Sequence, residues 1–316
     1  YCCWFNNFDS DLLYQQQYSI DSQDRKWHEY VLDFKKDSDG NIIVPLSVEA
    51  RPATNKDKDW MIVDIFRHPN REYKNLDVGG TDSYNEDQTQ TSKSLGGVVV
   101  VRRYDEFNMP DKEFNVRTVI CHYMKRPPRK EFFYEISLKI SVYYGLTKNM
   151  MLSAESDLII QYYKDNNGKK YMSPRPKSFD SVDSKQMHDF GAKMTSFSKP
   201  RMTGLLQSFV VDCVYNCWFS ELIINMLAYD YENIGTDWDN VDALGLALMR
   251  IVDMKRVPEI DNNSSTYEEE MELSSFKEVN GVIKIEGEKD DLDDMFEEGF
   301  KNADEFISNY DDDDYY

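Results

Sequence analysis

The chain has 316 residues, enough for one large domain or two ordinary ones, and 41% of them are hydrophobic, which suffices for a sizeable core. The net charge of −21 is uneven, because residues 259–316 hold 21 acidic residues and 4 lysines while residues 1–258 are near neutral. No apolar run reaches about 18 residues and the N-terminus lacks the pattern of a signal peptide, so we expect neither a membrane span nor an export signal.

The first half of the chain is predicted to be mostly β-structure. Because it begins with Tyr rather than Met, we expect a fragment or a processed piece. Residues 1–28 contain an amphipathic helical segment, FDSDLLYQQQY. Residues 29–70 predict a hairpin across the Asp39–Gly40 turn and then a strand. Three more strands follow, in the segments REYKNLDVGGTD, GGVVVVRRYD and EFNVRTVICHYMK.

Helices and strands alternate in the second half. Residues 130–145 predict a helix that ends at Gly145, and the next segments predict a short strand at NMMLSAE and a helix at SDLIIQYYKDNNG. After a loop with one short strand at GAKMT, a long helix is predicted over residues 202–231 and a last one over residues 236–255. This order predicts an α/β fold, a mixed sheet with helices on both faces.

We expect three parts along the chain: a β-rich linker region (1–70), the α/β domain (71–258) and an acidic, disordered tail (259–316). Within the tail, DDLDDMFEEGFKNADEFI is expected to become helical on a partner. Five cysteines without a C-x-x-C pair favour a reducing compartment. Cys213 and Cys217 are interpreted as core residues rather than zinc ligands, because no His or Cys pair is nearby in sequence.

Four acidic residues occupy comparable places in this pattern. Asp82 ends the first strand of the α/β domain, Glu155 ends the fourth, and Asp239 and Asp242 share one face of the last helix. Carboxylates at neighbouring strand ends and on a covering helix suit hard divalent cations such as Mg²⁺. Each acid also has an ordinary alternative: a turn residue for Asp82, a helix N-terminus for Glu155, and a capping box with Thr236 for Asp239.

Several segments together resemble a known family. They are YKNLDVGGTDSYNEDQTQTSKSLGGVVVV, NMMLSAESDLIIQYY, MTSFSKPRMTGLL and FSELIINMLAYDYENIGTDWDNVDALGLAL. These are similar to the nuclease half of tailed-phage terminase large subunits, closest to the crAss-like phages of Bacteroidetes, and the resemblance covers about residues 1–255. It implies a ribonuclease-H-like fold and endonuclease cutting of concatemeric double-stranded DNA during genome packaging, with two Mg²⁺ or Mn²⁺ ions.

The resemblance also implies site residues. Asp82, Glu155 and Asp239 match the catalytic metal ligands, with Asp82 expected to bridge both ions and Asp242 to assist. Asp77 is the alternative first ligand, although the motif register favours Asp82. The glycines before Asp82 are expected to let the substrate backbone approach closely. Candidate phosphate contacts are Lys125, Arg126, Arg129, Lys130, Lys199 and Arg201.

The implied partners are double-stranded DNA, the terminase ATPase motor region, the small terminase subunit and the portal protein. The implied location is the host cytoplasm of the infected bacterium, not the virion. This chain holds no G-x-x-x-x-G-K-[ST] loop, so it is not expected to be the ATPase itself. The alternative is a non-catalytic interaction module whose acidic tail docks a portal or capsid protein or masks the DNA site. Nucleotide binding by the paired glycines is disfavoured, because neither pair opens a helix after a strand. His68, His122 and His188 are assigned no role.

Overall fold

Seven strands form one mixed sheet in the order β2-β1-β3-β7-β6-β5-β8. The structure is a computed structural model, and it describes residues 8–24, 26–84, 95–103, 117–154, 157–177, 189–229, 238–254, 259–260, 276–279 and 282–285. The strands of the sheet are β1 (His28–Phe34), β2 (Val48–Pro52), β3 (Ile62–Ile65), β5 (Asp77–Asp82), β6 (Gly96–Arg102), β7 (Thr118–Lys125) and β8 (Met150–Leu152). Neighbouring strands are antiparallel except for β5 and β8, which run parallel.

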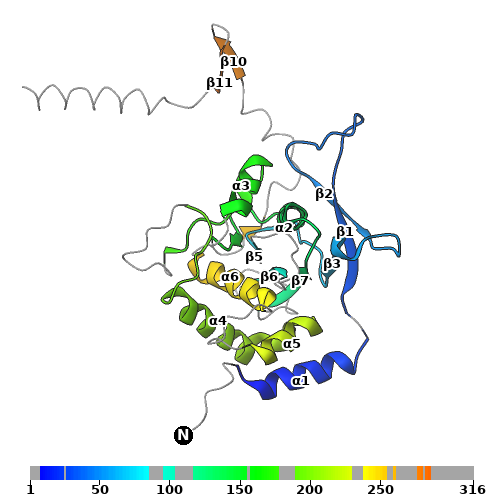
Figure 1. The fold of residues 1–316 in the computed structure, drawn as a ribbon, viewed down its shortest axis with the longest axis vertical. Helices are drawn as coiled ribbons and strands as arrows, with labels where there is room; N and C mark the ends of the chain where they lie inside the picture. The colour runs from blue at the N-terminus through cyan, green and yellow to red at the C-terminus, as the bar shows by residue number, and fades with distance from the viewer. Residues whose placement is uncertain are drawn as a thin grey trace, which may run out of the picture. The chain divides into compact units, whose positions relative to one another are not determined.

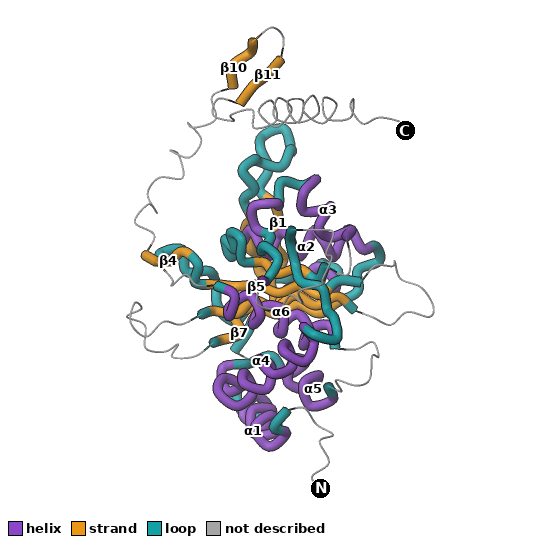
Figure 2. Tube along the Cα trace, turned by 90° about the vertical axis from the view of Figure 1, so that its left-hand side faces the viewer, coloured by secondary structure: helices purple, strands orange, loops and turns teal. Residues whose placement is uncertain are grey.

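Helices cover both faces of the sheet, as the sequence predicts (Figure 1). The helices are α1 (Ser10–Asp21), α2 (Lys130–Tyr143), α3 (Asp157–Asp165), α4 (Ser198–Cys213), α5 (Ser220–Ala228) and α6 (Asp239–Asp253). Figure 2 shows α2 and α3 on one side of the strands and α1, α4, α5 and α6 on the other. The α/β class and the mixed sheet are therefore confirmed.

The four consecutive valines of β6 pack into two different core clusters, one on each face of the sheet. Val98 and Val100 pack into the core cluster shared with α2 and α3, whereas Val99 and Val101 pack into the cluster shared with α4, α5 and α6. Successive side chains of a strand point to opposite faces, so a strand covered on both faces needs an unbroken apolar run. All four side chains are completely buried.

The long helix predicted over residues 202–231 is wrong. The chain turns out of α4 at Cys213 through a single 3₁₀ turn (Val214–Asn216), and α5 starts only at Ser220. The extended backbone of Cys217 lets its carbonyl accept a hydrogen bond from Gln16 Nε2 of α1, at 2.7 Å. Tertiary contacts to α1 thus override the local helical pattern. The interpretation of Cys213 and Cys217 as buried core residues is confirmed.

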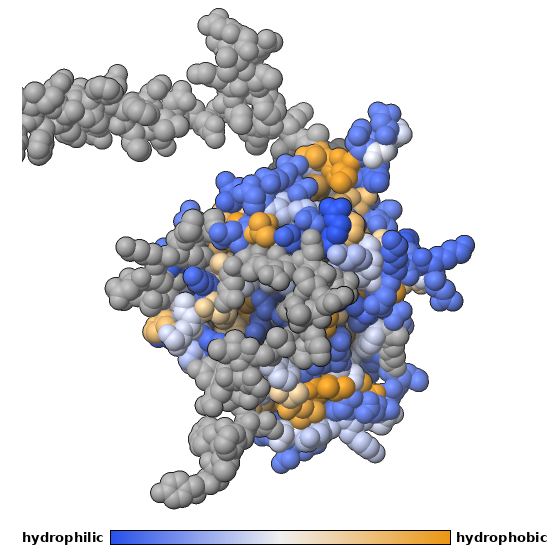
Figure 3. Space-filling view, viewed as in Figure 1, coloured by the Kyte–Doolittle hydropathy of each residue, from blue (hydrophilic) through white to orange (hydrophobic). Residues whose placement is uncertain are grey.

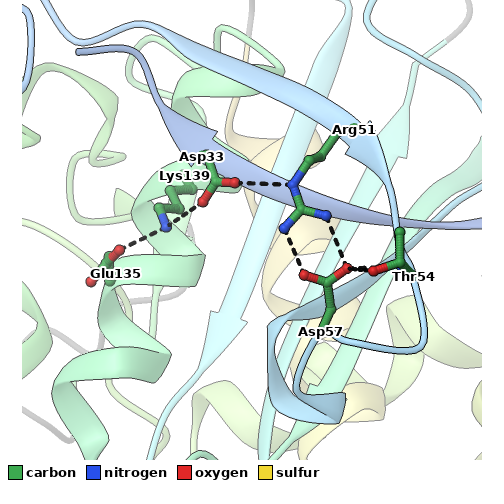
Figure 4. Close-up of polar contacts among 6 residues, drawn as sticks. All are labelled: Asp33, Arg51, Thr54, Asp57, Glu135 and Lys139. Atoms are coloured by element: carbon green, nitrogen blue, oxygen red, sulfur yellow. Dashed lines mark hydrogen bonds and ion pairs between the residues drawn. The ribbon is translucent and has the colours of Figure 1, made fainter.

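A polar network joins β1 and β2 to α2 (Figure 4). Arg51 donates to both carboxylate oxygens of Asp57, at 2.9 and 2.6 Å, and its Nε lies 3.5 Å from Asp33. Asp33 in turn lies 3.7 Å from the ammonium of Lys139 on α2, which also pairs with Glu135 at 2.7 Å. Residues 28–65 therefore share one sheet and one set of contacts with the following segment.

Residue contacts divide the chain into two units, Tyr1–Asp261 and Asn262–Tyr316. In the first unit, a short strand pair joins β4 (Tyr73–Lys74) to β9 (Glu259–Ile260). In the second unit, the described residues form a hairpin of β10 (Phe276–Val279) and β11 (Val282–Ile285). The helix expected in the acidic tail lies outside the described residues.

The surface in the view of Figure 3 is mostly hydrophilic. One hydrophobic patch lies near the connection between β1 and β2, where Ile42, Ile43 and Val44 are exposed. Apolar atoms form a large part of the surface of every folded protein, so we assign this patch no role.

Candidate active site

The two aspartates of β5 lie at opposite ends of that strand and have different surroundings. Asp77 is the first residue and is buried, with Arg102 donating to both of its carboxylate oxygens at 2.8 and 3.0 Å. Arg102 also donates to the carbonyl of His68, at 2.9 Å. Asp82 is the last residue, roughly 16 Å away for a strand of this length. Asp77 is therefore committed to a structural ion pair, and Asp82 is the acid at the end where the strand leads into the following loop.

The backbones of Asp82 and Asp239 both lie next to Gly97 of β6. Asp82 pairs with Gly97 of β6 in the sheet register, so it belongs to the strand rather than to a turn. A Cβ placed on Gly97 would lie only 2.3 Å from the carbonyl oxygen of Asp239, the first residue of α6. The backbone of α6 therefore rests directly on β6 beside Asp82. The structure brings these two acids to one end of the sheet.

The glycines before Asp82 have a different purpose from the one expected. A Cβ on Gly80 would lie 1.9 Å from the carbonyl oxygen of Ala243 in α6, and one on Gly79 would meet the side chains of Met150 and Leu146. The expectation that these glycines admit a substrate backbone is thus wrong. They admit the helix and the side chains that pack on the two faces of β5.

The first turn of α6 holds Asp239 and Asp242 by different contacts. The backbone N–H of Leu95, just before β6, donates to Asp239 Oδ2 at 3.0 Å. Asp242 Oδ1 accepts a hydrogen bond from the hydroxyl of Tyr229, at 3.3 Å. The residue that caps the helix is Trp238, so Asp239 is the first helical residue and not the third, as a capping box with Thr236 would require.

Tyr229 is a buried tyrosine that contacts Asp242. Burial, and then the negative charges of Asp242 and Asp82, raise the pKa of the Tyr229 hydroxyl well above its usual value. Of these two carboxylates, Asp242 is the one in hydrogen-bonding contact with the hydroxyl. Asp82, Asp239 and Asp242 are therefore gathered around the contact between β5, β6 and the start of α6.

Glu155, the remaining acid of the predicted set, lies outside the described residues. The residues just before it run beside Asp82: the N–H of Ser153 donates to the carbonyl of Thr81 at 2.8 Å, and β8 is parallel to β5. Carboxyl ends of parallel strands meet at one edge of a sheet, so β8 leads toward the edge that holds Asp82. Its place in the site stays a prediction.

The predicted basic residues differ in what they contact. Arg126 stacks on the ring of Tyr84, two residues beyond Asp82, with its guanidinium carbon 4.9 Å from the ring centre. Lys125 pairs with Asp59 at 3.0 Å and Arg129 with Glu131 at 3.2 Å. The contact with Tyr84 brings Arg126 close to the strand end that carries Asp82.

The other basic residues lie at two helix starts. Lys130 is the first residue of α2, whereas Lys199 and Arg201 belong to the first turn of α4. Thr203, one turn along α4, donates to the carbonyl of Lys199 at 3.1 Å.

The donor set consists of carboxylate oxygens, which Mg²⁺ and Mn²⁺ prefer. Among the described residues, no three His, Cys, Asp or Glu side chains lie close enough together to hold a metal ion. Glu155, a fourth candidate ligand, lies outside the described residues. Asp82, Asp239 and Asp242 therefore have the chemistry of Mg²⁺ or Mn²⁺ ligands, but the structure does not hold them in the geometry of a metal site.

The sequence did not reveal the polar residues that support this site. Asn240, next to Asp239, is fully buried; its amide accepts from Asn225 at 3.0 Å and donates to His122 Nε2 at 3.1 Å. His122 also lines a cavity of about 290 Å³ with Trp27, Phe219 and several carboxylates. Asn240 and Tyr229 have no motif of their own. Only their closeness to Asp239 and Asp242 in the fold identifies them.

No protein-family model matches this chain, and no curated protein matches it at a significant level. Among the described residues, every helix is too short or too polar to span a bilayer. The resemblance to phage terminases rests on sequence motifs alone, so the function is argued as a proposal.

Proposed function

We propose that this chain is a divalent-metal-dependent DNA endonuclease with a ribonuclease-H-like fold, the nuclease part of a viral terminase large subunit. The observation that carries the proposal is the meeting of Asp82 and the first turn of α6 across Gly97. The strand order supports the fold: three antiparallel strands, β5 to β7, precede a helix, and β8 returns parallel to β5.

The residues of the chain have separate tasks in this proposal. Asp82, Asp239 and Asp242, with Glu155, would hold the cations, and Arg126, Lys199 and Arg201 would hold the DNA phosphates. Two bound Mg²⁺ or Mn²⁺ ions would lower the pKa of a water molecule and stabilise the departing 3′-oxygen. Contacts to phosphate carry no base information, so we expect weak sequence specificity.

The alternative function is a non-catalytic interaction module of the packaging machine. The observation in its favour is the charge of residues 262–316, which hold 19 acidic residues and 4 lysines. Such a segment suits docking to a portal or capsid protein or masking of basic DNA contacts. In either function, the motor region, the small terminase subunit and the portal are the proposed partners, and the host cytoplasm is the proposed location.

Cleavage of supercoiled plasmid tests the proposal. We expect nicking and linearisation with Mg²⁺ or Mn²⁺, none with EDTA, and a loss of at least about 100-fold in Asp82→Asn and Asp239→Asn, because each substitution removes a charge that the cations require. Asp39→Asn is the matched control, since it removes the same charge from an exposed turn. Activity that survives in both site variants, or no metal-dependent cutting by the wild type, would contradict the endonuclease proposal.

A further inference from the structure

Basic residues gather at the end of the sheet that lies opposite to Asp82. The strands β5 and β8 begin at that end and β6 finishes there, so three connecting segments come together. They meet at Asn75, which precedes β5. Asn149, just before β8, donates its side-chain amide to Asn75 Oδ1 at 3.3 Å, and Arg103, just after β6, donates to the Asn75 carbonyl at 3.3 Å. The length of β5 separates these contacts from Asp82.

Exposed lysines belong to the same group of segments. The backbone N–H of Lys148, next to Asn149, donates to the carbonyl of Lys170 at 2.8 Å, which places the segment before β8 beside the 3₁₀ turn Lys169–Tyr171. The side chains of Lys148, Lys169 and Lys170 are all exposed. Three ammonium groups and the guanidinium of Arg103 therefore come from segments that contact one another.

Two further basic residues at this end have acidic neighbours. Lys74 lies opposite Glu259 in the register of β4 and β9. Arg250 of α6 contacts the segment before β8 and pairs with Asp253 at 3.4 Å. Because an acid beside a base reduces the local positive charge, the three exposed lysines, with Arg103 beside them, supply most of the positive potential at this end.

The chemistry of this surface suits the phosphate backbone of DNA. Ammonium groups on long exposed side chains contact phosphates as point charges and read no base sequence. A protein partner would instead favour an apolar centre to its interface. Among the described residues, no large exposed apolar side chain comes from the segments that carry these lysines. A nucleic-acid backbone is therefore the partner that this surface fits best.

We propose that this basic loop cluster, made of Arg103, Lys148, Lys169 and Lys170, is a second phosphate-binding surface for double-stranded DNA. It is separate from the basic residues predicted to contact DNA near Asp82. The choice of DNA as the occupant rests on the proposed function, whereas the binding itself requires neither a metal ion nor cleavage.

Fluorescence anisotropy of a short labelled DNA duplex with the full chain, in EDTA and over a series of salt concentrations, tests the inference. The combined variant Lys148→Gln, Lys169→Gln and Lys170→Gln should bind at least about 10-fold more weakly at low salt. The slope of log affinity against log salt concentration should become shallower by about 2 to 3, because each lost phosphate contact releases roughly one counterion fewer. Circular dichroism checks that the variant is folded.

The matched control combines three other substitutions, Lys35→Gln, Lys36→Gln and Lys56→Gln. It removes the same charge from exposed lysines that flank β1 and β2, and it should bind DNA as the wild type does. Equal losses of affinity in the two combined variants would mean that net charge alone matters, and would overturn the proposed surface. Unchanged binding and an unchanged salt slope in the first variant would overturn it as well.

Two further readouts separate the occupant and the proposed function from the surface itself. Polyglutamate that binds the wild type more tightly than the duplex does, and is lost in the first variant, would overturn DNA as the occupant in favour of an acidic protein. A wild-type chain that binds the duplex through these lysines but does not cut plasmid would contradict the endonuclease and still support the surface.

Discussion

Two arginine–aspartate pairs of this protein have similar geometry but opposite surroundings. Arg51 and Asp57 form a two-pronged contact at the surface, and Arg102 and Asp77 form one in the core. Hydrogen bonds from Arg51 lower the pKa of Asp57 well below its usual range. A carboxylate with a lowered pKa stabilises the fold above its unfolded pKa of about 3.9, and the contribution is lost as the pH falls through the folded value.

The buried pair predicts the larger effect of mutation. Arg102→Met leaves the Asp77 carboxylate buried without its partner, so we expect the free energy of unfolding to fall by about 3 to 5 kcal/mol. Arg51→Met, which breaks the exposed pair, should lower it by less, because solvent screens this pair. Urea denaturation followed by circular dichroism measures both. Equally small changes in the free energy of unfolding of the two variants would show that the Arg102–Asp77 pair adds little to stability.

At the scale of elements, the sequence predicted the parts whose own pattern is strong. The valine run of β6 and the helical spacing of α2 and α6 agree with the structure. Predictions failed where contacts with a segment distant in the sequence determine the local structure. The break after Cys213 depends on α1, and the crowding at Gly80 depends on α6, more than 150 residues later in the chain. For the candidate site, the sequence predicted Asp82, Asp239 and Asp242 as ligands. The contact of Tyr229 with Asp242 is visible only in the structure, where α5 packs on α6.

The contact between β5 and α6 predicts a strong effect at Gly80. Gly80→Ala would place its Cβ against the Ala243 carbonyl, so α6 must shift, and we expect a loss of about 1 to 3 kcal/mol in the free energy of unfolding. Gly204→Ala is the matched control. It lies within α4 with nothing within 4 Å of its added Cβ, and it should stabilise the protein by up to about 1 kcal/mol. Thermal denaturation compares the two. Equal melting temperatures would mean that α6 does not rest on β5 as closely as described.

At the scale of the whole molecule, charge separates the two units. Residues 262–316 carry a net charge of −15, so residues 1–261 carry only −6 of the total of −21. Repulsion between like charges opposes the approach of DNA, and salt screens it beyond roughly 10 Å at moderate ionic strength. The tail is therefore expected to weaken DNA binding most at low salt.

Truncation after Asp261 tests this expectation. The first unit has its own sheet and core, so we expect the shortened chain to melt within a few degrees of the full one. Its affinity for a short DNA duplex, measured by fluorescence anisotropy, should exceed that of the full chain at low salt and approach it at high salt. Equal affinity at all salt concentrations would argue against masking, and a loss of affinity would mean that the second unit itself binds DNA.

The close approach at Gly97 also limits how this protein can change. Main-chain atoms of β6 and α6 set the distance between the backbones of Asp82 and Asp239, and any side chain at Gly97 would push them apart. Substitutions at Gly97 therefore cannot adjust this distance in small steps. A site with a wider span would have to arise by lengthening an acid, from Asp to Glu, while the glycine between them stays unchanged.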